Sequence, residues 1–192
     1  MNVTQFMQEG AVTALPGTPV KTIQKVMDEK GFGILLIAEA EGRLVGFVTR
    51  AAVKAANEDV AVERIAHAVK ATVSSTDTLE KAALIMLEQR LVLLPVTEDG
   101  RLIGVITQSE ILRGLAQGLG IGLEATRLSI QLRPESQDLY NVLEILRAHG
   151  AHVISIARGE PRGDRCEIVL RIQGVADRDQ LREKLENCLR DA

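Results

Sequence analysis

The chain has 192 residues, of which 46% are apolar and 26% charged, so its composition is globular and excludes disordered and fibrous classes. A net charge of −3 at pH 7, with no Trp and only 2% aromatic residues, argues against a nucleic-acid-binding protein. The longest apolar stretches, such as Leu91 to Val96, fall far short of the roughly 20 residues of a membrane-spanning helix. Because the N-terminus also lacks a secretion signal, we expect a cytoplasmic protein.

The first part of the chain predicts a helix followed by a β-hairpin. Apolar spacing predicts a helix around Val20 to Glu29, with Gly31 at its end. Two strands follow, from Ile34 to Ile37 and from Leu44 to Val48, joined by a turn near Gly42. A further short strand before the helix and a helix after the hairpin complete the unit.

This order of elements recurs in the next part of the chain. A shift of 59 residues relates Val20, Ile23 and Met27 to Leu79, Ala82 and Met86. A shift of 58 residues relates Gly42, Gly46 and Thr49 to Gly100, Gly104 and Thr107, so one residue is lost in the hairpin turn. In the second copy, Asp77 and Glu80 have the spacing of a helix capping box, and Leu91 to Val96 and Leu102 to Ile106 are the expected strands. The first two thirds are therefore a tandem repeat.

The last third has a different order. The glycines at 114, 118, 120 and 122 predict a linker in place of a continuing helix. After it we expect a strand from Thr126 to Leu132, a helix ending near Gly150, and strands from Val153 to Ala157 and from Cys166 to Ile172 around a turn-rich segment. The final helix, capped by Asp177, places Leu181, Leu185, Cys188 and Leu189 on one face.

None of the known catalytic or metal-binding motifs is present in the sequence. It has no Gly-x-Ser-x-Gly elbow, no phosphate-binding Gly-x-x-x-x-Gly-Lys-Ser/Thr loop and no His-Glu-x-x-His pair. His149 and His152 flank Gly150, which predicts a surface turn and not a metal site. His67 is expected to face solvent or line a cleft, and Cys166 and Cys188 are expected to be packing residues. We therefore expect a protein without catalytic residues, bound metal or cofactor.

The repeat resembles the cystathionine-β-synthase (CBS) domain family. The resemblance rests on residues 93–112, Leu-Leu-Pro-Val-Thr-Glu-Asp-Gly-Arg-Leu-Ile-Gly-Val-Ile-Thr-Gln-Ser-Glu-Ile-Leu, and on the matching residues 35–53 of the first copy. It implies an α/β fold in which two CBS repeats, residues 1–60 and 61–118, form one Bateman module with up to two clefts between them. Residues 119–125 would be a linker, followed by a last domain at 126–192.

The resemblance also implies a nucleotide site at the Gly-h-h-Thr-x-x-Asp pattern, where h is apolar. The N–H groups at the start of the following helix would bind a phosphate, and the carboxylate at the end of the pattern would accept hydrogen bonds from a ribose. The second repeat has Glu110 in place of Asp, whereas the first has Ala52, so we expect one occupied cleft in each chain. The implied nucleotide-binding residues are Val12, Phe32, Gly33, Ile34, Val105, Ile106, Thr107, Ser109 and Glu110.

Two of these residues also fit other roles. Phe32 suits the core as well as the cleft, and Thr107 with Glu110 has the spacing of a capping box that needs no ligand. The regulatory ligand implied by the resemblance is adenine-containing, namely AMP, ADP, ATP or S-adenosylmethionine. Binding would act allosterically, without a reaction.

The order βαββα in the last domain resembles a ferredoxin-like ACT domain. The resemblance rests on residues 132–146, Leu-Arg-Pro-Glu-Ser-Gln-Asp-Leu-Tyr-Asn-Val-Leu-Glu-Ile-Leu, although no Gly follows Pro134 and the chain ends before a fourth strand. The CBS–CBS–ACT layout is similar to the acetoin-utilization B-type (AcuB-like) proteins of bacteria. It implies a homodimer or higher homo-oligomer, a small-molecule adenine ligand and a possible protein target. An amino-acid sensor with a CBS scaffold, and a dimerisation module without ligand, are the alternatives.

Overall fold

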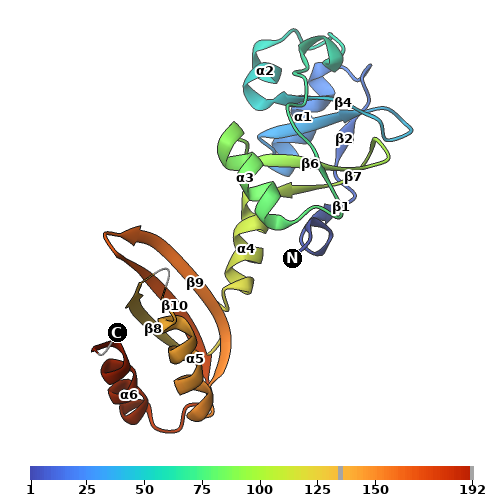
Figure 1. Cartoon of the computed structure of the whole chain (residues 1–192). Helices are drawn as coiled ribbons and strands as arrows, with labels where there is room; N and C mark the ends of the chain where they lie inside the picture. Colours follow the sequence, from blue (N-terminus) through green and yellow to red (C-terminus); the bar gives the residue numbers. More distant parts are fainter. Residues whose placement is uncertain (134–135, 191–192) are drawn as a thin grey trace. The chain divides into compact units, whose positions relative to one another are not determined.

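The computed structural model describes residues 1–133 and 136–190 and contains two compact units, Met1–Gly114 and Leu115–Ala192 (Figure 1). The first unit holds two copies of one arrangement. The first copy comprises β2 (Thr13–Ala14), α1 (Val20–Lys30), β3 (Ile34–Ala38), β4 (Leu44–Thr49) and α2 (Arg50–Ala55). The second comprises β5 (Val73–Ser74), α3 (Leu79–Gln89), β6 (Leu93–Glu98), β7 (Arg101–Thr107) and α4 (Gln108–Gly118), whose last turn belongs to the second unit. The tandem repeat is therefore confirmed.

Strand pairing is the same in the two copies. β2 pairs in parallel with β3, and β3 pairs antiparallel with β4, just as β5 pairs in parallel with β6 and β6 antiparallel with β7. The helix α1 buries Val20, Ile23 and Met27, the three apolar positions predicted from its spacing, against strand residues such as Ile37 and Val48. Since these side chains are at most 2% exposed, they form a dry core for the first copy.

The N-terminal segment belongs to the sheet of the second copy and not to the first. After a short helix (Val3–Gln5), β1 (Gln8–Glu9) pairs antiparallel with β7, which gives the strand order β1-β7-β6-β5. The N–H of Val3 donates to the carbonyl of Asp77 at 2.8 Å, so the segment is also tied to the start of α3. The first copy has only β2-β3-β4, and a second short helix (Val62–Ile65) lies between the copies.

Three details of the second copy differ from the sequence prediction. The helix cap is Thr78, whose hydroxyl accepts from the N–H of Lys81, while Asp77 instead binds the Lys81 ammonium and the Ser74 N–H. The strand begins at Leu93 and not Leu91, because the Leu91 N–H still donates to Met86 at the end of α3. Gly114 lies inside α4, where a Cβ would overlap the Leu79 side chain, so it serves close packing and not a linker.

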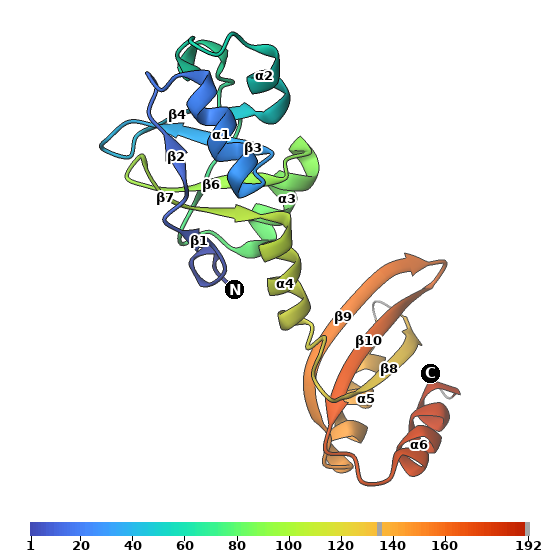
Figure 2. The same ribbon diagram turned by 180° about the vertical axis from the view of Figure 1, so that it is seen from behind.

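The second unit is a three-stranded antiparallel sheet with two helices on one face (Figure 2). Its elements are β8 (Thr126–Leu132), α5 (Asp138–Ala148), β9 (His152–Arg162), β10 (Arg165–Gln173) and α6 (Arg178–Arg190), so the predicted order βαββα is confirmed. The strand order is β8-β10-β9. Its core includes Val142 and Leu146 of α5, Leu170 of β10, and Leu181 and Leu185 of α6.

Two predictions for the second unit need comment. The strand β9 continues past Ala157 to Arg162, so most of the segment predicted as a turn is strand. An irregularity in the register between Cys166 and Ile168 still lets Pro161 pair with Cys166. Asp177 is confirmed as a cap, since its carboxylate accepts from the N–H groups of Asp179 and Gln180. The absence of a Gly after Pro134 falls outside the described residues, as does the side chain of Leu189.

Candidate ligand-binding cleft

The first unit contains a cleft of 450 Å³ between its two repeats. One wall comes from residues 8–12 and from the turn that follows α1, and the other comes from β6 and β7. The lining residues are Gln8, Glu9, Gly10, Ala11, Val12, Gly31, Phe32, Gly33, Ile34, Leu36, Val92, Leu93, Val105 and Thr107. Most of this surface is apolar or backbone, with the polar groups of Gln8, Glu9 and Thr107 at the wall.

Six of the nine residues predicted to bind a nucleotide lie on this wall: Val12, Phe32, Gly33, Ile34, Val105 and Thr107. Ile106 does not, because successive strand residues face opposite sides and its side chain is fully buried in the core. Ser109 is exposed and also lies off the wall. Phe32 was expected to suit either the core or the cleft, and it contacts both: it packs against the core of the first copy and also borders the cleft. The binding roles of all nine residues stay predictions.

Glu110 lies behind the cleft wall and is only 7% exposed. Its Oε2 accepts from the backbone N–H of Thr107 at 3.1 Å and from the Thr107 hydroxyl. Its Oε1 accepts from the side-chain amide of Gln8 at 2.9 Å. Burial raises the pKa of Glu110, but the hydrogen bonds from Thr107 and Gln8 together outweigh it, so the pKa lies below its ordinary value. The carboxylate is therefore charged at neutral pH and holds β1, β7 and α4 together.

Only half of the capping box predicted for Thr107 and Glu110 is present. The Glu110 carboxylate accepts from the Thr107 backbone as the motif requires, but the Thr107 hydroxyl donates to the same carboxylate. A carboxylate has about four acceptor positions, and the donors here are the Thr107 hydroxyl, the Gln8 amide and the backbone N–H groups of Thr107 and of Glu110 itself. A ligand hydroxyl would therefore have to replace one of these donors.

Two glycines let other segments cross the hairpins closely. A Cβ on Gly104 would lie 2.5 Å from the backbone oxygen of Gln8, and one on Gly46 would lie 2.7 Å from that of His67. These are the first residues of the Gly-h-h-Thr pattern in each repeat, so this glycine admits a neighbouring strand. Eight wall residues were not predicted from the sequence, namely Gln8, Glu9, Gly10, Ala11, Gly31, Leu36, Val92 and Leu93. The glycine at position 104 was the available signal that another backbone approaches there.

The equivalent cleft on the other side of the repeat is small. It measures 120 Å³ and is lined by Ile34, Leu36, Phe47, Val69, Lys70, Ala71, Arg90, Leu91, Val92, Leu93 and Pro95. Phe47 is the counterpart of Val105, and its ring lies against the His67 imidazole with centroids 5.5 Å apart. The Thr49 hydroxyl caps α2 by accepting from the N–H of Ala52. The two clefts therefore differ in volume as well as in the carboxylate.

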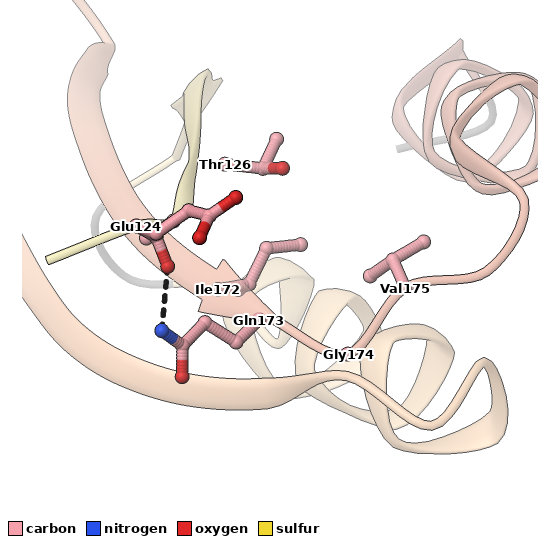
Figure 3. A pocket seen from close by; sticks show the side chains of 7 residues that line it. Glu124, Thr126, Ile172, Gln173, Gly174 and Val175 are labelled. Atoms are coloured by element: carbon pink, nitrogen blue, oxygen red, sulfur yellow. Dashed lines mark hydrogen bonds between the residues drawn. The ribbon is translucent and has the colours of Figure 1, made fainter.

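The second unit has two further hollows. One, of 410 Å³, lies where β8 begins and β10 ends, and Glu124, Thr126, Gln173 and Val175 border it (Figure 3). The other, of 630 Å³, runs along β8 beside α6. Among residues 1–133 and 136–190, no three His, Cys, Asp or Glu side chains gather as metal ligands would. Within the same ranges, every helix is too short or too polar to cross a membrane.

The comparisons with known proteins match the first unit. A family model for the CBS domain matches residues 3–59 and 62–117, which is more than half of the chain. A solved structure of CBSX2 in complex with AMP is 26% identical, with a TM-score of 0.56 over 60% of this chain and 96% of that one. An acetoin utilization protein candidate (AcuB) from Vibrio cholerae is 20% identical, with a TM-score of 0.57 over 63% of this chain and 94% of that one.

A third solved structure is the cytosolic domain of the Mg²⁺ channel MgtE in complex with ATP. It is 21% identical, with a TM-score of 0.55 over 59% of this chain and 48% of that one. At this identity the likeness shows the fold alone. Each of the two matched segments of the family model contains one copy of the repeat, apart from the last residue of α4, and the first segment also includes β1. The chain therefore belongs to the CBS-domain family.

Proposed function

We propose that this protein is a non-catalytic regulator that binds an adenine-containing ligand in the 450 Å³ cleft between its CBS repeats. The carrying observation is that the cleft combines apolar walls and open backbone with a charged carboxylate behind Thr107. Its volume lies in the range of about 300 to 1,000 Å³ typical of small-molecule sites. The AMP and ATP bound to two of the similar structures support the ligand class.

The proposed binding mode follows the chemistry of the wall. Adenine would lie between apolar side chains such as Ile34 and Val105, and the hydroxyl of Thr107 and the start of α4 would face the phosphate. A ribose hydroxyl would replace one of the donors that bond to the Glu110 carboxylate. The ligand candidates are AMP, ADP, ATP and S-adenosylmethionine, and occupancy would shift the packing of the two repeats.

We assign the second unit to the ACT-like domains and keep the division at 1–60, 61–118, 119–125 and 126–192 as part of the proposal. The support is its βαββα order with both helices on one face of the sheet. In this scheme it reads the state of the CBS pair, for a protein target, in an AcuB-like homodimer. The alternative, in which the second unit itself senses an amino acid, is tested by the thermal-shift measurement described below.

The test is calorimetric titration of the wild type and of Val105→Phe with AMP, ATP and S-adenosylmethionine. The phenylalanine copies Phe47, which the other repeat accommodates, so it should fill the cleft and leave the fold intact. We expect one ligand per wild-type chain and no measurable binding to Val105→Phe, with an unchanged circular dichroism spectrum. Equal affinity in the two proteins would refute the site. A thermal shift caused by amino acids and retained in Val105→Phe would favour the alternative.

A further inference from the structure

The outer edge of β8 has no neighbouring strand among the described residues. β8 lies at one margin of the sheet and pairs only with β10, over all seven residues from Thr126 to Leu132. Because alternate residues of an antiparallel strand direct N–H and C=O away from the partner strand, this edge presents backbone donors and acceptors. The 630 Å³ groove beside it is apolar at its base, where it is lined by Leu128, Ile130, Val175, Leu181 and Leu185.

The hollow shown in Figure 3 continues this groove around the start of β8. The two cavities share Thr126, Ile172 and Val175. Every β8 residue from Thr126 to Gln131 lines one or both of these cavities. Figure 2 shows β8 at the margin of the sheet nearest α6, with β9 at the other margin.

The two edges of this sheet differ in the features that prevent strand pairing. β9 contains Gly159 and Pro161 and has two irregularities in its pairing with β10. β8 has no proline, no bulge, no lysine and no carboxylate, and its pairing with β10 is regular throughout. Natural sheets protect exposed edges with such features, so an unprotected edge indicates a paired surface.

We propose that β8 pairs antiparallel with β8 of a second copy of this chain, about a two-fold axis at Ser129, to make a continuous six-stranded sheet. Ser129 is the midpoint of the strand, so this register pairs all seven residues. It places Leu128 of one copy beside Ile130 of the other on the helix side, and Arg127 beside Gln131 on the open side. Like charges therefore do not meet, and the apolar row continues across the axis.

The charges at the two ends of the groove also fit a two-fold contact. Arg165 lies at the Leu132 end of β8, because its neighbour Cys166 pairs with Leu132. Asp179, in the first turn of α6, lies at the other end, near Thr126. Neither side chain has a hydrogen bond or ion pair in the described part of the chain. A two-fold axis brings the Asp179 end of one copy to the Arg165 end of the other, which pairs opposite charges.

The test is disulfide cross-linking of full-length Ser129→Cys in a Cys188→Ser background. Residues that face each other across antiparallel strands have Cα atoms about 4.5 to 5.5 Å apart, within the range that a disulfide spans. The matched control is Ala157→Cys, which lies in the same row of the sheet on the opposite edge, since Ser129 and Ala157 both pair with Val169. We expect Ser129→Cys to form covalent dimers at least about tenfold faster, because pairing raises the effective thiol concentration.

Equal cross-linking rates for the two variants would overturn the proposal, as would a slow rate for both. If Ser129→Cys folds poorly, the double variant Arg127→Cys/Gln131→Cys places two thiol pairs across the same axis and must then cross-link faster than Ala157→Cys. Charge reversal gives an independent readout. Asp179→Arg should slow cross-linking at position 129 about two- to fivefold, as expected for an exposed ion pair, and Arg165→Asp added to it should restore the rate. None of these results depends on nucleotide binding.

Discussion

The hydrogen bonds of Glu110 predict a stability that depends on pH. Replacing Glu110 by Gln keeps the size of the side chain but removes its charge. A hydrogen bond to a charged group contributes roughly 1.5 to 3 kcal/mol and a neutral one roughly 0.5 to 1.5 kcal/mol. A rotated Gln8 amide can still bond to the new side chain, so all three bonds become neutral and none is lost outright. Three such changes amount to roughly 3 to 4.5 kcal/mol, but burial penalises the charged carboxylate and offsets part of this. We therefore expect Glu110→Gln to lose about 1 to 2 kcal/mol of stability in the first unit at pH 7.

The sign of the pH dependence follows from the lowered pKa of Glu110. In the unfolded chain its pKa is near 4.5 and in the folded protein it is lower, so the carboxylate stabilises the fold above pH 4.5. This contribution is lost as the pH falls through the pKa of Glu110 in the folded protein, because the wild-type side chain then also becomes neutral. The difference between wild type and Glu110→Gln should therefore shrink towards zero at an acid pH below the folded pKa of Glu110.

Amide hydrogen exchange in the full chain measures this difference locally. Peptides from β7 should exchange roughly 5 to 30 times faster in Glu110→Gln at pH 7, which corresponds to 1 to 2 kcal/mol. Peptides from β10, in the second unit, serve as the internal reference and should not change. Unchanged protection of β7 at pH 7, or an equal loss at both pH values, would refute the role given to the Glu110 charge.

Three further outcomes are expected. Glu110→Ala should weaken AMP binding about ten- to a hundredfold in a calorimetric titration, and Thr49→Ala, whose hydroxyl caps α2 in the first repeat, should leave it unchanged; equal affinities would remove the ribose role. Gly104→Ala should lower stability by about 1 to 3 kcal/mol in urea unfolding because β1 must move, whereas Gly33→Ala, with open space around it, should be nearly neutral. Leu146→Ala should remove about 2 to 5 kcal/mol from the second unit, and a smaller loss would mean that α5 collapses into the cavity.

Local patterns predicted the repeat well because each copy is built from short-range signals. The spacing of Val20, Ile23 and Met27 indicated the buried face of α1, and the glycine turn near Gly42 indicated the hairpin. The same signals failed where a distant segment decides the outcome. Gly114 was predicted to be a linker residue because its close contact with the Leu79 side chain cannot be inferred from the local sequence.

In the candidate site, too, residues within local patterns were predicted and residues placed by distant contacts were not. Val105 and Thr107 were found from the motif, and the structure places both on the cleft wall. Gln8 was not found, because a two-residue strand has no periodicity and its pairing with β7 is a long-range contact. Ile106 was assigned to the site because the motif names a run of residues without regard to the alternation of faces along a strand.

The pairing of β1 with β7 has a consequence for synthesis on the ribosome. Gln8 emerges about 100 residues before its partner Val105. At roughly 5 to 20 residues per second, this strand waits about 5 to 20 s for its place in the sheet. During this interval the first copy can complete its own three strands, since none of them needs the N-terminal segment. A substitution in β1 that weakens this pairing should therefore impair folding only at the late step in which the second copy completes its sheet.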